Sequence, residues 1–172
     1  ELAETDLEAA RSKVRLFVRI GSNQTNDYYE YEQPLTPSKF SNDADELWRT
    51  FVSYNGEFRD LNSMNINLSA FNQLRVLRSQ LGFAEVHPDS VFWSVLPDGT
   101  PREGAPDVSA FAPPGTRIGV KGNPSLARVN TIVIGIRNPA DATNGYTDLD
   151  VLQKVTVWLN ELRASGYDDE GG

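Results

Sequence analysis

Two segments near the start of the chain alternate with a period of two, and this pattern constrains the fold more than any other feature. Residues 14–20 read VRLFVRI, and residues 28–33 read YYEYEQ. Such a period places successive side chains on opposite faces of a β-strand. The charged positions are Arg15, Arg19, Glu30 and Glu32. If the two strands pair across the loop GSNQTND, these arginines and glutamates share one face, where each opposite-charge pair contributes about 0.2–1 kcal/mol.

Further apolar segments predict a mainly β chain. The additional expected strands are Ser63–Leu68, Val91–Leu96, Ile118–Val120, Val129–Arg137 and Val155–Arg163. Ile118–Val120 and Val129–Arg137 should form a hairpin, in which Ile132, Ile134 and Ile136 make one apolar face. The last strand has apolar residues on both faces, so we expect it inside a sheet with Trp158 largely buried.

Two segments predict short helices. Apolar residues recur at positions 71, 74, 77 and 81, which indicates a helix over Ala70–Leu81 that begins after Ser69 as N-cap and stops at Gly82. A shorter helix is expected over Leu47–Val52. Thr100–Gly115 contains four prolines and should be a long irregular loop.

These elements fit a β-sandwich best, and we predict one of the galactose-binding-like jelly-roll type with one or two short helices. Residues 1–12 would be an N-terminal connector and residues 13–163 the sandwich. Residues 164–172 change abruptly to Ser, Gly, Asp and Glu, which cannot bury enough surface to order themselves. They are interpreted as an acidic exit linker.

Composition limits the classes of partner. The 172 residues are enough for one domain. A net charge of −8 and the absence of any basic run argue against nucleic-acid binding. There is no cysteine, which excludes disulfides and thiolate metal sites. No apolar run is long enough for a transmembrane helix, so the sequence is interpreted as a water-soluble part of a larger protein that does not itself insert into the membrane.

No residue set predicts catalysis, and we expect the chain not to be an enzyme. The single histidine, His87, precedes a proline and has no nucleophile elbow to serve. Glu30 and Glu32 would lie about 6–7 Å apart along one strand, a spacing that a carboxylate pair could use. A solvated strand face is the simpler interpretation of these two glutamates. Lys121–Pro124 lacks the pattern of a phosphate-binding loop and is expected to be a turn.

Two groups of residues have a composition that binding sites share, and each also has a simpler interpretation. Asp168, Asp169 and Glu170, with Asp27 or Glu161, could bind a hard cation such as calcium, but no known spacing supports this. An acidic linker explains them better, and we expect no metal or other cofactor. The aromatic residues Trp48, Trp93 and Trp158, with the run Tyr28–Tyr31, could stack on sugar rings. Burial in the core is the more common role of such residues.

Several stretches of sequence resemble the SprA/Sov family of Bacteroidetes gliding-motility and secretion proteins. The final segment, VWLNELR followed by DEGG, carries the first resemblance. Lys13–Pro34 is similar to the family's strand, loop and Tyr-rich strand, and Gly119–Pro139 to its KGNPSL and IGIRNP segments. Asp60–Gly82 fits more loosely. Phe40–Arg59 and Phe83–Pro114 show no family pattern.

The resemblance implies a function in protein transport. Its members form a very wide outer-membrane barrel, the channel of the type IX secretion system, which passes folded cargo to the cell surface and supports gliding. This chain would then be a non-catalytic structural or docking domain, extracellular or periplasmic, beside that channel. Its partners would be other segments of the parent translocon, accessory outer-membrane proteins or secreted cargo. The alternative is a carbohydrate-binding jelly-roll module of a secreted protein, which an exposed coplanar aromatic pair would favour.

Overall fold

The computed structural model describes residues 14–35, 51–54, 57–60, 62–82, 87, 89–137 and 159. The chain divides into two compact units, Glu1–Pro139 and Ala140–Gly172, and every helix and strand described below belongs to the first unit. The second unit contains the predicted strand Val155–Arg163, of which only Leu159 is described. Leu159 lies in no strand and is 63% exposed, so the predicted burial is wrong at this position. Its apolar character had suggested burial, yet an apolar side chain is buried only where another element covers it.

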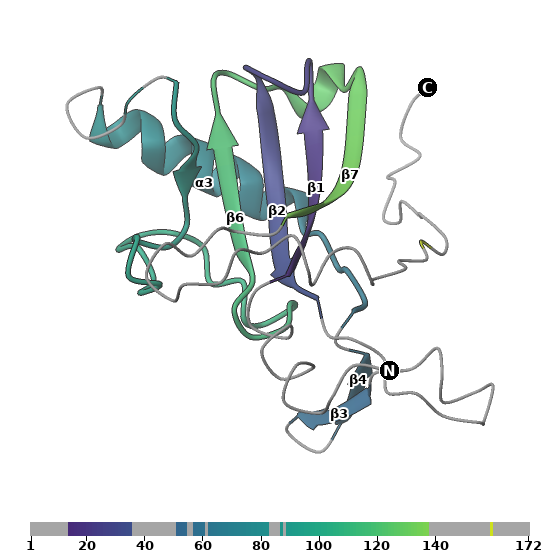
Figure 1. The fold of residues 1–172 in the computed structure, drawn as a ribbon. Helices are drawn as coiled ribbons and strands as arrows, with labels where there is room; N and C mark the ends of the chain where they lie inside the picture. Colours follow the sequence, from purple (N-terminus) through teal and green to yellow (C-terminus); the bar gives the residue numbers. More distant parts are fainter. Residues whose placement is uncertain are drawn as a thin grey trace, which may run out of the picture. The chain divides into compact units, whose positions relative to one another are not determined.

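The main element is a five-stranded antiparallel sheet in the order β5-β6-β2-β1-β7 (Figure 1). Its strands are β1 (Arg15–Gly21), β2 (Tyr28–Pro34), β5 (Phe92–Trp93), β6 (Arg117–Lys121) and β7 (Thr131–Arg137). The predicted pairing of the first two strands is confirmed, with Arg19 opposite Glu30 and Phe17 opposite Glu32. Only two residues of the expected strand Val91–Leu96 belong to β5, because Val95 and Leu96 pair with Pro101 and Thr100 across the turn that ends at Gly99.

The connection from β6 to β7 differs from the prediction. We expected a hairpin, but β6 pairs with β2 and β5, whereas β7 pairs with β1. The intervening chain, which includes the short 3-10 helix η1 (Leu126–Arg128), therefore crosses the end of the β1–β2 hairpin. Two consecutive strands with a short connection look like a hairpin in the sequence. Only the long-range strand pairing distinguishes a hairpin from a connection that crosses two other strands.

One helix, α3 (Leu68–Leu81), packs on the sheet and confirms the predicted helix, although it begins two residues earlier. The N-cap is Asn67 rather than Ser69, since the Asn67 side chain accepts a hydrogen bond from the Ser69 backbone N–H at 2.9 Å. Residues 63–67 form no strand, so the predicted strand Ser63–Leu68 is wrong. The Asn67 side chain thereby satisfies a free N–H of the first helical turn, as an N-cap side chain does.

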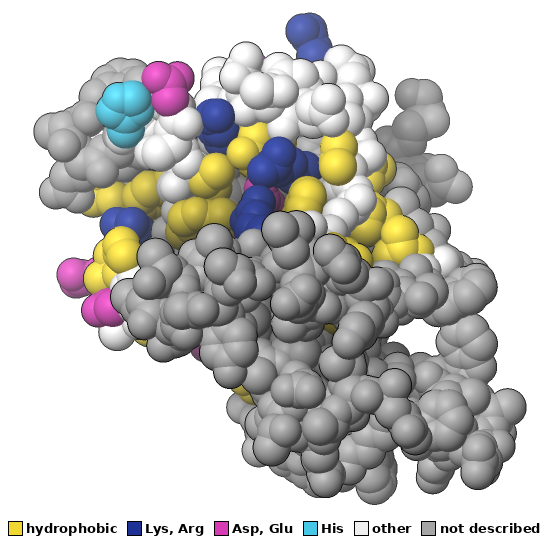
Figure 2. All heavy atoms as spheres, in the orientation of Figure 1, with side chains coloured by type: hydrophobic (Ala, Val, Ile, Leu, Met, Phe, Trp, Pro, Cys, Tyr) yellow, Lys and Arg dark blue, Asp and Glu magenta, His cyan; other side chains and the backbone are white. Residues whose placement is uncertain are grey.

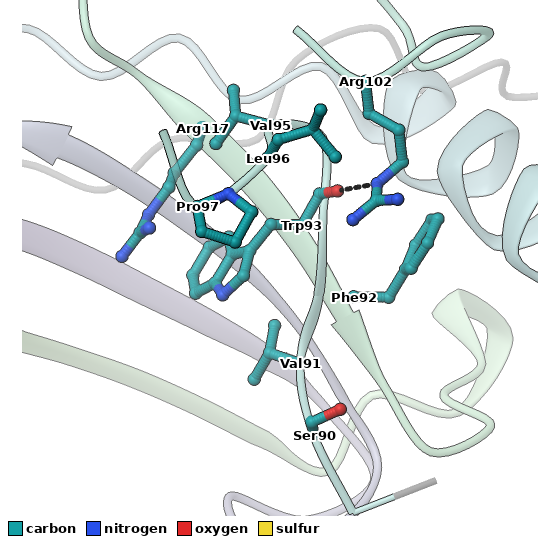
Figure 3. A pocket seen from close by; sticks show the side chains of 9 residues that line it. All are labelled: Ser90, Val91, Phe92, Trp93, Val95, Leu96, Pro97, Arg102 and Arg117. Carbon is teal, nitrogen blue, oxygen red and sulfur yellow. Dashed lines mark hydrogen bonds between the residues drawn. The ribbon is translucent and has the colours of Figure 1, made fainter. Parts of the chain in front are cut away.

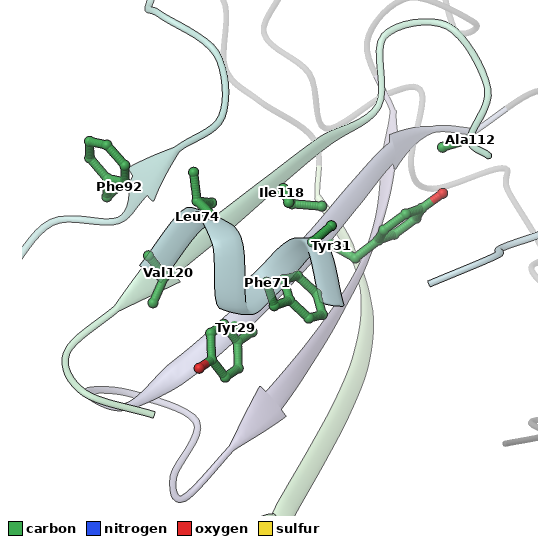
Figure 4. Packing of buried hydrophobic residues seen from close by; sticks show 9 residues of the cluster. Tyr29, Tyr31, Phe71, Leu74, Phe92, Ala112, Ile118 and Val120 are labelled. Atoms are coloured by element: carbon green, nitrogen blue, oxygen red, sulfur yellow. The ribbon is translucent and has the colours of Figure 1, made fainter. Parts of the chain in front are cut away.

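The hydrophobic core lies between α3 and the sheet (Figure 4). Phe71 and Leu74 of the helix are fully buried, and the Phe71 ring stacks on Tyr29 with centroids 5.0 Å apart. The sheet contributes Tyr29, Tyr31, Ile118 and Val120, which alternate with the residues of the opposite face. On the helix side of β7, Ile132 is 50% and Ile136 is 36% exposed, so the apolar face predicted for this strand is only partly buried.

The described part of the chain is mainly β with one α-helix, which agrees with the predicted class. A second, two-stranded sheet contains β3 (Phe51–Tyr54) and β4 (Glu57–Asp60). Phe51 and Val52 therefore belong to a strand, which contradicts the end of the helix predicted over Leu47–Val52; the rest of that segment lies outside the described residues. The jelly-roll sandwich, and the division at residues 12 and 163, stay predictions.

Candidate functional site

The sheet face opposite α3 carries a cluster of charged side chains. Alternation along the strands turns Tyr29, Tyr31 and Ile118 toward the helix and the neighbouring charged residues away from it. The members of this cluster, called the arginine face below, are Arg15, Arg19, Glu30, Glu32, Arg117 and Arg137. Figure 2 views the molecule from this side and shows Lys and Arg side chains grouped among hydrophobic ones.

Glu32 lies at the centre of the arginine face and contacts three guanidinium groups. Arg117 donates from Nε to Glu32 Oε1 at 2.9 Å, and its Nη2 lies 2.7 Å from the same oxygen. Arg15 pairs with this oxygen as well, while Arg137 pairs with Glu32 Oε2. The carboxylate is therefore shared by side chains from β1, β6 and β7.

Glu30 contacts two guanidinium groups. Arg19 Nε donates to Glu30 Oε2 at 2.7 Å. Arg137 Nη2 lies 2.7 Å from Glu30 Oε1, an ion pair without an aligned hydrogen bond at that oxygen. Arg137 thus bridges the two glutamates and ties β7 to β2 across β1.

Both carboxylates are fully buried, so the expected solvated strand face is wrong for Glu30 and Glu32. Removing a charge from water costs several kcal/mol unless close opposite charges and hydrogen bonds compensate. Here the guanidinium groups supply that compensation and also cover the carboxylates. The predicted pairing of Arg15 and Arg19 with the glutamates is confirmed. The burial of Glu30 and Glu32 also depends on Arg117 and Arg137, which are distant from them in sequence.

Aromatic rings frame the arginine face. The Arg117 guanidinium lies 4.0 Å from the Trp93 ring centroid, and that of Arg19 lies 4.4 Å from the Tyr28 centroid. Arg137 lies 5.0 Å from the Phe17 centroid. Guanidinium groups stack favourably on such rings, by about 0.5–1 kcal/mol at exposed sites and more when desolvated. Each of these rings therefore helps to fix the position of the guanidinium group beside it.

Two glycines make room for these rings. A Cβ at Gly119 would lie 2.8 Å from Trp93 Cε3, and one at Gly135 would lie 2.6 Å from Phe17 Cζ. Both distances are too short for real atoms, so each ring occupies space that any other residue would fill. The aromatic frame thus depends on glycine at the neighbouring strand position.

The arginine face has more positive than negative charge. Four arginines surround two glutamates, although the whole chain has a net charge of −8. Burial lowers the pKa of Arg15, while the nearby Glu32 carboxylate partly offsets this by raising it. The Arg15 Nη2 also donates to the Gly115 backbone carbonyl at 2.5 Å. The arginine side chains keep 16–29% exposure, whereas the two carboxylates have none.

A shallow pocket of about 350 Å³ adjoins the arginine face at the β5 edge (Figure 3). Its apolar lining includes Val91, Trp93, Leu96 and Pro97, and its two charged residues are Arg102 and Arg117. Arg102 Nε donates to the Trp93 backbone carbonyl at 2.9 Å, and its guanidinium lies 4.4 Å from the Phe92 centroid. Phe92 and Trp93 are consecutive strand residues, so the two arginines lie on opposite sides of β5.

The remaining catalytic candidate, His87, has no nucleophile beside its imidazole among the described residues. His87 is exposed in a loop, and its Nδ1 lies 3.9 Å from Asp89 Oδ2. The Ser90 hydroxyl donates to the backbone carbonyl of His87 rather than to its imidazole. Nothing in this geometry activates the serine.

The predicted acidic cluster lies mostly outside the described residues. Only Asp27 can be placed, and its carboxylate accepts hydrogen bonds from the Asn123 backbone N–H at 2.8 Å and from Asn23 Nδ2 at 3.2 Å. Asp27 therefore fixes the predicted turn at Lys121–Pro124 against the β1–β2 loop. Within the described ranges, no three His, Cys, Asp or Glu side chains are grouped so as to hold a metal ion.

The aromatic candidates are not arranged as a sugar-stacking platform where they can be placed. Tyr29 and Tyr31 belong to the core, and Tyr28 is buried beneath Arg19. The Trp93 ring is half-buried and stacks with Arg117. Trp48 and Trp158 lie outside the described residues.

Sequence reasoning missed three members of the site: Arg102, Arg117 and Arg137. Each lies far along the chain from Glu30 and Glu32, and only the strand order brings Arg117 and Arg137 beside them. The sequence contained one signal for Arg117 and Arg137. Each stands at one end of an apolar strand, at a position whose side chain points to the face opposite the apolar residues.

Comparison with known proteins places the chain in a family. The sequence model SprA_N, described as motility related/secretion protein, matches residues 2–172, and the chain belongs to this family as an N-terminal domain of the SprA type. The match includes the two segments in which the sequence showed no family pattern. Neither the curated proteins nor the solved structures contain a match. Among the described helices, none combines the length and apolarity needed to cross a bilayer.

Proposed function

We propose that this chain is a non-catalytic docking domain of an outer-membrane translocon for type IX secretion and gliding motility. Membership of a motility and secretion family supports a role in protein transport. The domain would lie outside the cell or in the periplasm. Its partners would be other segments of the translocon, accessory outer-membrane proteins or secreted cargo.

The arginine face is the observation that carries this proposal. A glutamate that acts as general acid or base must reach its substrate. Glu30 and Glu32 have no exposed surface, and each contacts at least two guanidinium groups. The buried carboxylates therefore hold the arginines in place, which suits a rigid contact surface better than a reaction centre.

Deletion within the parent protein tests the role. Residues 13–163 are removed, and the amount of parent protein assembled in the outer membrane is measured separately from the cargo secreted. We expect normal assembly with reduced secretion. Normal secretion after the deletion would refute the docking role, and an isolated chain that hydrolyses ester, glycoside or peptide substrates through one carboxylate would refute the non-catalytic assignment.

A further inference from the structure

The arginine face has charge and donors that its own carboxylates do not use. Arg117 contacts Glu32 through Nε and Nη2, which leaves Nη1 without a partner among the described residues. A guanidinium has five N–H donors and prefers planar, bidentate acceptors such as carboxylates. Because Glu30 and Glu32 are fully buried beneath the arginines, an approaching molecule meets positive charge.

The adjoining pocket adds a second arginine and an apolar surface. No carboxylate in the described part of the chain pairs with Arg102, whose guanidinium makes one hydrogen bond there, from Nε to the Trp93 backbone carbonyl. Between Arg102 and Arg117 lie the side chains of Leu96, Pro97 and Trp93 (Figure 3). The pocket thus combines a space for an apolar side chain with a guanidinium on either side of β5.

We propose that the arginine face and this pocket bind an extended acidic segment of a partner protein. Carboxylates of the segment pair with Arg117 and Arg102, and an apolar side chain between them enters the pocket beside Trp93. This inference rests on the docking role proposed above and specifies the chemistry of the partner.

Charge favours a peptide over an anionic membrane as the occupant. A membrane presents negative charge across the whole approaching surface, and charges interact over a Debye length of about 8–10 Å. The chain has a net charge of −8 despite the positive arginine face, so most of its surface is repelled by such a membrane. A peptide segment contacts only the arginine face and pocket, where the charge is complementary.

Binding of a defined peptide to the 172-residue chain tests the inference. The probe is a short labelled peptide of alternating glutamate and leucine, and the control peptide has glutamine in place of glutamate. Fluorescence anisotropy at low salt should detect binding of the first peptide only. The substitutions Arg117→Gln and Arg102→Gln should each weaken binding about 10- to 150-fold, the range for loss of one hydrogen bond to a charged group.

The variants are chosen so that folding does not confound the result. Arg102→Gln removes no ion pair seen in the described residues, and Arg117→Gln leaves Glu32 paired with Arg15 and Arg137. Arg75→Gln is the matched control, because Arg75 is exposed on α3, lies across the sheet from the arginine face and does not line the pocket. It should change the affinity by less than about twofold.

Four outcomes would overturn the inference. Equal binding of the two peptides, or full affinity in both Arg102→Gln and Arg117→Gln, excludes carboxylate recognition. Arginine-dependent sedimentation with phosphatidylglycerol vesicles, without peptide binding, would assign the surface to a lipid headgroup. If the peptide fails to bind while deletion of residues 13–163 still reduces secretion, the docking role stands and only the acidic partner is refuted.

Discussion

Arg19 and Glu30 lie directly opposite each other in β1 and β2, and Arg19 Nε is 2.7 Å from Glu30 Oε2. This pair depends on the strand register, since a shift of one residue would turn both glutamates of β2 toward the hydrophobic core. The same register places Tyr29 and Tyr31 against α3. The alternation of side chains along β2 therefore places its tyrosines in the core and its glutamates in the arginine face.

Removing the central carboxylate should destabilise the sheet strongly. Glu32→Gln leaves the guanidinium groups of Arg15, Arg117 and Arg137 close together with one carboxylate fewer. Loss of one partner from a buried ion pair costs about 3–5 kcal/mol of unfolding free energy, which urea unfolding would measure. The control is Glu103→Gln, at an exposed loop position, where we expect a change within about 0.5 kcal/mol.

Removing one guanidinium should cost less than removing the carboxylate. Arg117→Gln is expected to lose about 1–3 kcal/mol, because Glu32 retains Arg15 and Arg137. The same urea measurement applies. A larger loss for Arg117→Gln than for Glu32→Gln would mean that stacking on Trp93, rather than the ion pairs, holds this part of the sheet.

The packing of α3 on the sheet predicts a large effect at Leu74. This side chain is fully buried, so Leu74→Ala should lower the free energy of unfolding by about 2–5 kcal/mol. Val76 is on the same helix and is 51% exposed, and Val76→Ala should cost less than about 1 kcal/mol. Similar losses from the two substitutions in urea unfolding would contradict the assigned core.

The contact between Phe17 and Gly135 predicts that substitutions at these two positions have non-additive effects on the free energy of unfolding. Gly135→Ala places a methyl group on the Phe17 ring, and overpacking of this kind costs about 1–3 kcal/mol. In a Phe17→Leu background the smaller side chain leaves space, so the same substitution should cost less. A double-mutant cycle on unfolding free energies measures the difference. Strict additivity of the two substitutions would show that the ring does not depend on this glycine.

The sequence alone predicted the elements whose signals are local. The alternation of residues 14–20 and 28–33 correctly predicted a β-hairpin with opposite charges on one face. Helical spacing through Phe71 and Leu74 likewise predicted α3 and its buried side. Such patterns persist because a strand or helix must bury one face wherever it lies.

The arginine face itself could not be predicted, because it depends on strand order. Arg117 and Arg137 reach Glu32 only because β6 pairs with β2 while β7 pairs with β1. The sequence favoured a β6–β7 hairpin instead, which would have placed these arginines elsewhere. Burial of Glu30 and Glu32 follows from that topology, so their local sequence suggested a solvated face. Asn67 was missed for a different reason, since both Asn67 and Ser69 are good N-cap residues.

The buried hydroxyl of Tyr31 predicts how stability depends on pH in the alkaline range. Burial raises the pKa of Tyr31 to about 12 from its ordinary value of 10.0. The unfolded chain therefore loses this proton first, so the contribution to stability is complete below pH 10 and is lost as the pH rises toward about 12. A shift of this size corresponds to about 2–3 kcal/mol. Burial also raises the pKa values of Tyr28 and Tyr29, and these two residues add to the loss of stability at alkaline pH.

Substitution of Tyr31 measures how much this residue contributes to the alkaline loss of stability. Tyr31→Phe removes the ionisable group and also the hydrogen bond that the hydroxyl donates to Gln33 Oε1 at 2.8 Å, so it should lower stability at neutral pH by about 1 kcal/mol. Urea unfolding below pH 10 and again between pH 10 and about 12 should then show a smaller alkaline loss than in the unsubstituted chain. Identical losses in the two proteins would mean that other groups cause the alkaline decline and that Tyr31 is accessible to water.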